Sequence, residues 1–417
     1  MRDTTKFRDL HKNVKTRLVT GFLDRLITQL IVPFMAIYLN AHFGGGLAGV
    51  MIALSVVLAM LSGLYGGYWA NLFGRKTVML QSEISRMIAL ALMAACNSPW
   101  VKLPFFTFLL FIILLVSSSI SLPANDAMII DVSTPETRKY IYTTNYWITN
   151  LSLALGTSIG AFLYKNHFFG LLLFCSAASL AMYIIIRVFI MESYKRDNYT
   201  GGVKAPSIIE DYKVVARDTL FMSFCVLAVL NSGLEMQLPN YISVRLSRQF
   251  GLHQLFHMHG GIISINGVEM FGILGSENTI LVVVLAFVVN SMCSRMRNTH
   301  RLSLGTLIFT IGYMVLAVDN SPWILMSMTL FYTLGELMYV PVKQKVLADL
   351  VSDDARSQYM AVYGLNSRFG LLIASFCISL GTLVSSWAIS GLYALMGIAI
   401  LLIYRHVLTP LACTGSN

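Results

Sequence analysis

Two segments 218 residues apart decide the fold, PANDAMIIDVSTPETR at residues 123–138 and PVKQKVLADLVSDDAR at residues 341–356. A proline, an aspartate and an arginine keep their spacing in both, as Pro123 and Pro341, Asp131 and Asp349, and Arg138 and Arg356. The offset is about half of the 417-residue chain. The sequence therefore predicts two halves of six helices each, related by duplication.

The composition places these halves in a membrane. The chain is 56% hydrophobic and only 12% charged, with a mean hydropathy of +0.69, whereas a soluble domain has about 25% charged residues. At roughly 35 residues per span and connection, the length accommodates twelve membrane helices and no large soluble domain. The apolar runs lie near residues 19–41, 47–70, 78–97, 104–127, 140–163, 168–190, 219–241, 278–295, 302–319, 322–346, 359–384 and 388–405.

The basic residues predict the orientation. With the N-terminus inside, twenty lysines and arginines fall in inner segments, and the outer loops hold four, Lys102, Lys165, Arg245 and Arg248. This bias predicts that both termini face the cytoplasm. The net charge of +10 then follows from topology and anionic lipid, and no nucleic-acid partner is needed.

The organisation is typical of a carrier. We expect an N-terminal six-helix bundle over residues 1–191, a polar cytoplasmic linker over 192–218 and a C-terminal bundle over 219–417. Two pseudo-symmetric bundles can rock around a site near the midplane. The sequence thus predicts a transporter that works as a monomer in the cytoplasmic membrane of a bacterial cell, not an enzyme, with a small-molecule substrate and no cofactor besides the proton gradient.

Carboxyl groups inside the spans are the candidates for proton coupling. Asp24, Asp126, Glu235 and Glu336 lie mid-span, and Glu83 and Asp131 lie nearer the inner surface. Glu336 has no basic neighbour within one helical turn. Because hydrocarbon disfavours a charged carboxyl, Glu336 is the best candidate to take up and release a proton, and a permanent hydrogen bond is the alternative.

Buried polar and basic residues are the candidates for the substrate cavity. The set is Asp24, Arg25, Arg86, Asn145, Asn150, Glu235 and Arg368. An interhelix pair of Asp24 with Arg86 is the structural alternative to a cavity role. Arg187, Lys343 and Lys345 lie near inner helix ends, where we expect them to reach the interface.

The repeated Asp and Arg residues are candidates for an inner gate. We expect Asp131, Arg138, Asp349 and Arg356 to form ion pairs between helices at the inner surface, and solvated loop charges are the alternative.

The cysteines and histidines predict no metal centre. None of the six cysteines forms a CxxC pair, and every histidine falls outside the spans or at their ends. His253, His257 and His259 cluster in the outer loop after the seventh span. We expect this segment to be an ordinary surface loop, and a metal site is the alternative.

Three stretches carry a resemblance to a family. GGYWANLFGRKTVML at residues 66–80 resembles the GxxxDxxGRK signature of the major facilitator superfamily, with Asn71 where the family has Asp and with Gly74, Arg75 and Lys76 matching its end. Residues 125–164 and FYTLGELMYVPVKQKVLADL at 331–350 resemble the LmrP-like multidrug antiporters of that superfamily.

The resemblance implies export driven by proton entry. Glu336 matches the carboxylate of span ten, Asp131 the acid at the inner end of span four, and residues 71–76 the cytoplasmic gate. Two positions depart from the multidrug relatives: Asn145 replaces an acid, and the span-seven acid is missing near Pro239, with Glu235 one turn earlier.

The cargo is the open question. Because arginine binds carboxylates in a bidentate fork, Arg25, Arg86 and Arg368 favour an anionic or zwitterionic molecule such as a carboxylate-type siderophore. The alternative is a broad multidrug:proton antiporter for lipophilic cations.

Overall fold

The computed structural model describes residues 10–133, 135–192, 215–258, 261–351 and 356–414. It forms two compact units, Met1–Gly44 with Met51–Asn198, and Gly45–Val50 with Tyr199–Asn417. Most of the linker predicted at 192–218 falls at residues 193–214, outside the described part of the chain.

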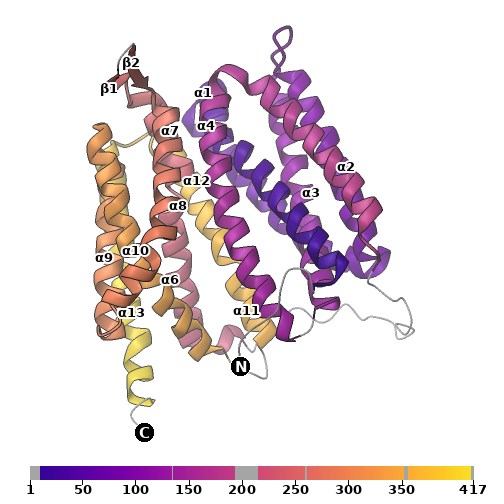
Figure 1. Ribbon diagram of the computed structural model, residues 1–417. Coiled ribbons are helices and arrows are strands. Elements are labelled where there is room, and N and C mark those ends of the chain that lie inside the picture. The colour runs from indigo at the N-terminus through magenta and orange to yellow at the C-terminus, as the bar shows by residue number, and fades with distance from the viewer. Residues whose placement is uncertain (1–9, 134, 193–214, 259–260, 352–355, 415–417) are drawn as a thin grey trace. The chain divides into compact units, whose positions relative to one another are not determined.

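The first unit consists of long helices, α1 (Lys12–Phe73), α2 (Arg75–Cys96), α3 (Pro104–Asp131) and α4 (Pro135–Phe189) (Figure 1). Non-helical backbone interrupts α1 at Gly44, with φ 78°, and α4 at His167. Each of these helices therefore contains two of the predicted spans with a one-residue break in place of the predicted loop. Glycine suits such a break because it adopts positive φ without steric cost.

Helix α2 packs along α3 and α4 (Figure 1). A buried apolar cluster joins the end of α1, α2, α3 and α4, formed by Ala70, Val78, Met79, Ala124, Met128, Ile186 and Ile190. Helix α1 approaches α3 closely at Gly66, where a Cβ atom would lie 2.4 Å from the carbonyl oxygen of Ile120. Any larger side chain at Gly66 would separate the two helices.

From Thr219 onward, the second unit contains a nearly continuous helix built from α6 (Thr219–Glu235), a π-turn (Leu238–Ile242) and α7 (Ser243–Gln249). A two-stranded antiparallel hairpin follows, β1 (His253–Met258) and β2 (Gly261–Ile265). The remaining helices are α8 (Gly267–Met292), α9 (Asn298–Leu316), α10 (Pro322–Leu350), α11 (Arg356–Gly364), α12 (Asn366–Leu380) and α13 (Ser386–Thr414).

The long outer loop predicted between residues 241 and 278 is wrong. Helix α7 extends the seventh span to Gln249, and α8 begins at Gly267. The start of α8 is fixed by a capping box, in which the Asn266 side chain accepts from the backbone of Glu269 and the Glu269 side chain accepts from the backbone N–H of Asn266. His253 and His257 lie in β1, and His259 lies outside the described residues.

Nine helices among the described residues are long and apolar enough to cross a membrane, and two of them, Lys12–Ala70 and Trp147–Phe189, exceed the length of one crossing. If each of these two helices crosses twice and α9 crosses once, the total equals the twelve predicted spans. Pro123 lies inside α3 and Pro341 inside α10, so the proline of the sequence repeat occupies a helix interior in both units. The chain is an all-α membrane protein.

Candidate functional site

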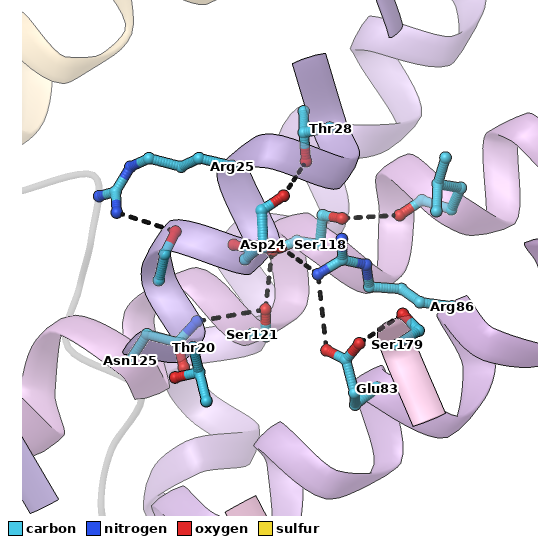
Figure 2. Close-up of polar contacts among 12 residues, drawn as sticks. Thr20, Asp24, Arg25, Thr28, Glu83, Arg86, Ser118, Ser121, Asn125 and Ser179 are labelled. Carbon is cyan, nitrogen blue, oxygen red and sulfur yellow. Dashed lines mark hydrogen bonds and ion pairs between the residues drawn. The ribbon is translucent and has the colours of Figure 1, made fainter. Parts of the chain in front are cut away.

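A buried ion-pair network joins three helices of the first unit (Figure 2). Arg86 of α2 is 2% exposed, and its Nη1 donates to Oδ1 of Asp24 in α1. The same nitrogen lies 3.5 Å from Oε2 of Glu83, whose Oε1 accepts from the Ser179 hydroxyl of α4 at 2.6 Å. Two carboxylates thus face one guanidinium. The Asp24–Arg86 pair is the interhelix contact that the sequence offered as the alternative to a role in the substrate cavity.

Two further arginines of α1 lie near this network. Arg17 is buried and donates from Nη1 to Thr20 Oγ1 at 2.9 Å, although the first apolar run of the sequence begins only near residue 19. Arg25 is half-buried and donates to the carbonyl oxygen of Gly21 at 3.2 Å (Figure 2). Both guanidinium groups act electrostatically on Asp126 of α3, an exposed side chain. The first unit therefore has Asp126 as its accessible mid-span acid.

In the second unit, Glu336 lies in the middle of α10 and is held by a neutral donor. Asn278 Nδ2 of α8 donates to Glu336 Oε2 at 3.2 Å and to Thr333 Oγ1 at 2.9 Å. Within the described part of the chain, no lysine, arginine or histidine nitrogen lies within 4.0 Å of the Glu336 carboxylate. A carboxyl that accepts from a neutral amide and forms no ion pair can be either protonated or charged without losing an ion pair.

Glu235 and Lys343 are charged side chains that act electrostatically on Glu336. Glu235 ends α6 and its side chain is exposed, although its helical neighbours are buried. Lys343 is half-buried on α10, with Nζ 5.4 Å from the centre of the Tyr339 ring. An accessible carboxylate in mid-span requires water, a cation or a proton beside it, because hydrocarbon offers none of these.

Glu277 is a functional candidate that the sequence analysis missed. It lies in the interior of α8 next to Asn278 and is half-buried, and its Oε2 has no hydrogen-bond partner among the described residues. The predicted span began only at residue 278, so Glu277 counted as a loop residue. The capping-box signature N-x-x-E at Asn266 and Glu269 ahead of an apolar run could have revealed it.

The predicted cytoplasmic gate is partly described. Gly74, with φ 92°, separates α1 from α2. Glu192, after the end of α4, accepts from the backbone N–H groups of Arg75 at 3.1 Å and of Lys76 at 2.9 Å. Lys76 Nζ donates to the carbonyl oxygen of Arg187 at 2.8 Å. These contacts attach the start of α2 to the end of α4.

The other gate residues are less fully described. The side chains of Asn71, Asp131, Arg138 and Arg356 lie outside the described part of the chain, and Asp349 is exposed at the end of α10. The predicted inner-gate ion pairs therefore stay predictions.

The remaining predicted cavity residues occupy helices of both units. Asn145 and Asn150 lie half-buried in α4, and Arg368 half-buried in α12. Arg245, assigned from sequence to an outer loop, is instead buried in α7, where it donates to Asn320 Oδ1 at 2.8 Å and to the Leu316 carbonyl oxygen at 3.0 Å. Among the described residues, no group of three or more His, Cys, Asp or Glu side chains could hold a metal ion.

Comparisons with known proteins identify the family. The model of the Major Facilitator Superfamily matches residues 18–265, more than half of the chain. The chain is 28% identical to a Na(+), Li(+), K(+)/H(+) antiporter of Planococcus maritimus, over 89% of this chain and 90% of that protein. It is 23% identical to the multidrug resistance protein MdtH of Klebsiella pneumoniae (strain 342), over 85% and 82% of the two chains.

Solved structures share the fold. A POT family transporter in complex with 5-aminolevulinic acid has a TM-score of 0.74 at 14% identity, over 97% of this chain and 96% of that one. The human organic anion transporter MFSD10 has a TM-score of 0.63 at 17% identity, over 94% and 98%. The chain is a multi-pass membrane protein and belongs to the major facilitator superfamily, whose members are transporters and not enzymes.

Proposed function

We propose that the protein is a proton-coupled antiporter in which Glu336 carries the proton. The observation that supports this proposal is the Glu336 carboxyl in the middle of α10. Among the described residues its hydrogen-bond partner is the neutral Asn278, and Glu235 and Lys343 act on it electrostatically. Protonation neutralises Glu336 and releases a cation from it, and deprotonation on the other side restores the binding charge. The antiporter among the relatives supports the same coupling.

The cargo best supported is a monovalent cation, organic or inorganic, moved out of the cytoplasm. Of the three arginines that favoured an anion, Arg86 is neutralised by Asp24 and Glu83 and is not available to a substrate. The second unit adds Glu277 to the acids Glu235 and Glu336. The two named relatives are an antiporter of alkali cations and a multidrug resistance protein, which supports this choice.

An exporter of an anionic or zwitterionic molecule, such as a carboxylate-type siderophore, is the second candidate. Arg25 and Lys343 favour it, because both are half-buried and neither forms an ion pair within 4.0 Å among the described residues. In either case we propose a plasma-membrane carrier with both termini in the cytoplasm, acting as a monomer on small molecules, with protons as the coupling ion.

The test uses purified protein in proteoliposomes that enclose a pH-sensitive dye. Addition of sodium, potassium or ethidium should move protons in the opposite direction, and addition of citrate should not. Proton movement with citrate but with none of the cations would overturn the cation proposal in favour of the second candidate.

Two matched variants test the role of Glu336. Glu336→Gln keeps the shape of the side chain but cannot release a proton, so exchange should fall about 100-fold or more, the lower end of the effect of losing a proton-transfer group. Glu269→Gln, the control, changes the capping box of α8 and should keep exchange. Normal proton-driven exchange in a folded Glu336→Gln protein would overturn the assignment.

A further inference from the structure

A cavity at one end of the first unit is not explained by proton coupling. Its volume is about 420 Å³, within the usual range of small-molecule sites. It is formed where three helix connections meet: the end of the first half of α1 at Tyr38 and His42, the α2–α3 loop at residues 97–102, and the break in α4 at residues 164–169.

The cavity is positively charged. Lys102 and Lys165 line it, and none of its lining residues is an aspartate or glutamate. These are two of the four basic residues that the sequence places in outer loops, where lysine and arginine are otherwise scarce. Their convergence on one cavity is therefore not explained by the orientation of the helices.

The floor is aromatic and already ordered. Tyr38 is 4% exposed and donates to Asn97 Oδ1 at 2.7 Å. The Tyr38 ring lies 5.6 Å from Phe168, which contacts Tyr164 edge-to-face at 5.2 Å. His42 Nδ1 donates to the Tyr38 carbonyl oxygen at 2.9 Å, so its Nε2 is the ring atom left for a ligand. A ligand would thus contact an aromatic base with defined internal contacts and the exposed ammonium groups of Lys102 and Lys165 at the rim.

Large apolar side chains within four residues of Lys102 in sequence are exposed. Trp100 is 85% exposed, and Phe105 and Phe106 are each 55% exposed. Exposed aromatic residues at a helix end of a membrane protein mark the lipid–water interface. A soluble anion would make no apolar contact with such a rim, whereas the acyl chains of a lipid would pack against it.

We propose that this cavity binds the phosphodiester headgroup of an anionic phospholipid of the outer leaflet. Lys102 and Lys165 contact the phosphate as point charges, the aromatic floor packs against the glycerol backbone, and the acyl chains lie along Trp100 and Phe105. The site belongs to one unit, and its occupancy does not depend on the substrate that the transporter moves.

The experiment titrates short-chain phosphatidylglycerol into the purified full-length protein and reads the rise in thermal stability. Each lysine should contribute about fivefold to the apparent Kd, so Lys102→Gln with Lys165→Gln should weaken binding about 25-fold. The double variant to arginine should keep most of the affinity. Arg248→Gln, which removes an exposed arginine that does not line the cavity, should bind as the wild type does.

Two further ligands identify the source of the phosphate. Phosphatidylcholine of the same chain length should bind weakly because its headgroup has no net charge, and glycerol phosphate should bind weakly because it has no acyl chains. Equal affinity of the wild type and the lysine-to-glutamine double variant would overturn the site. Binding of glycerol phosphate as tight as that of the lipid would overturn the lipid assignment.

Discussion

Replacing Arg86 by leucine should destabilise the protein strongly. The guanidinium is 2% exposed and is the partner of both Asp24 and Glu83. Its removal leaves two carboxylates in an apolar bundle, and breaking a buried pair in this way costs about 3–5 kcal/mol. For a unit of roughly 190 residues, about 2–4 °C per kcal/mol gives a fall in Tm of roughly 6–20 °C.

The assay is thermal unfolding in detergent with a dye that fluoresces on reaction with thiols. Cys175 of α4 is fully buried and becomes reactive only when the first unit opens. Arg295→Leu, which removes an exposed arginine, is the control and should change stability by less than about 0.5 kcal/mol. Its Tm should therefore stay close to that of the wild type.

A triple variant separates charge from packing. Arg86→Leu combined with Asp24→Asn and Glu83→Gln replaces the ion pairs by neutral groups, and such replacements are often neutral or stabilising. Most of the lost stability should return, because Ser179 can still donate to the amide oxygen at position 83. A single variant as stable as the wild type, or a triple variant no more stable than the single one, would refute the electrostatic argument.

Two further predictions concern helix starts. Gly267→Ala should lower the free energy of unfolding by about 1–3 kcal/mol, because the new Cβ would overlap the Leu246 carbonyl oxygen. Gly251→Ala is the control in the same dye assay, because a Cβ atom there would have no neighbour within 4 Å. Glu192→Ala removes the acceptor for two backbone N–H groups of α2 and should cost about 1 kcal/mol. Glu192→Gln keeps one acceptor oxygen and should lower the free energy of unfolding by less than Glu192→Ala does. An equal loss of stability in the two variants would contradict a capping role for Glu192.

Hydropathy predicted the helices well because each membrane span must satisfy its own backbone hydrogen bonds and therefore has to be a long apolar run. Hydropathy misplaced the start of a helix whose first turns contain polar residues. Helix α8 carries Glu269, Glu277 and Asn278 in its first half, so its apolar run is visible only from residue 278 onward. The error removed Glu277 from the candidate acids.

Partners across helices could not be predicted, because residues far apart in sequence meet only after packing. The contact of Asn278 with Glu336 joins positions 58 apart, and Ser179 meets Glu83 across 96. The pairing of Asp24 with Arg86 is the exception, because the residue types made it the structural alternative to a cavity role, and the structure shows this pair. The family resemblance, in contrast, was carried by the GRK loop and by residues 125–164 and 331–350.

Pro123 in α3 and Pro341 in α10 have a mechanical consequence. A proline removes one backbone hydrogen bond from its helix and lowers the bending stiffness at that point. Each bundle therefore has a compliant point on the helix that ends near its repeated aspartate, Asp131 or Asp349. The last two turns of each helix can tilt about the proline while the outer part of the same helix stays packed.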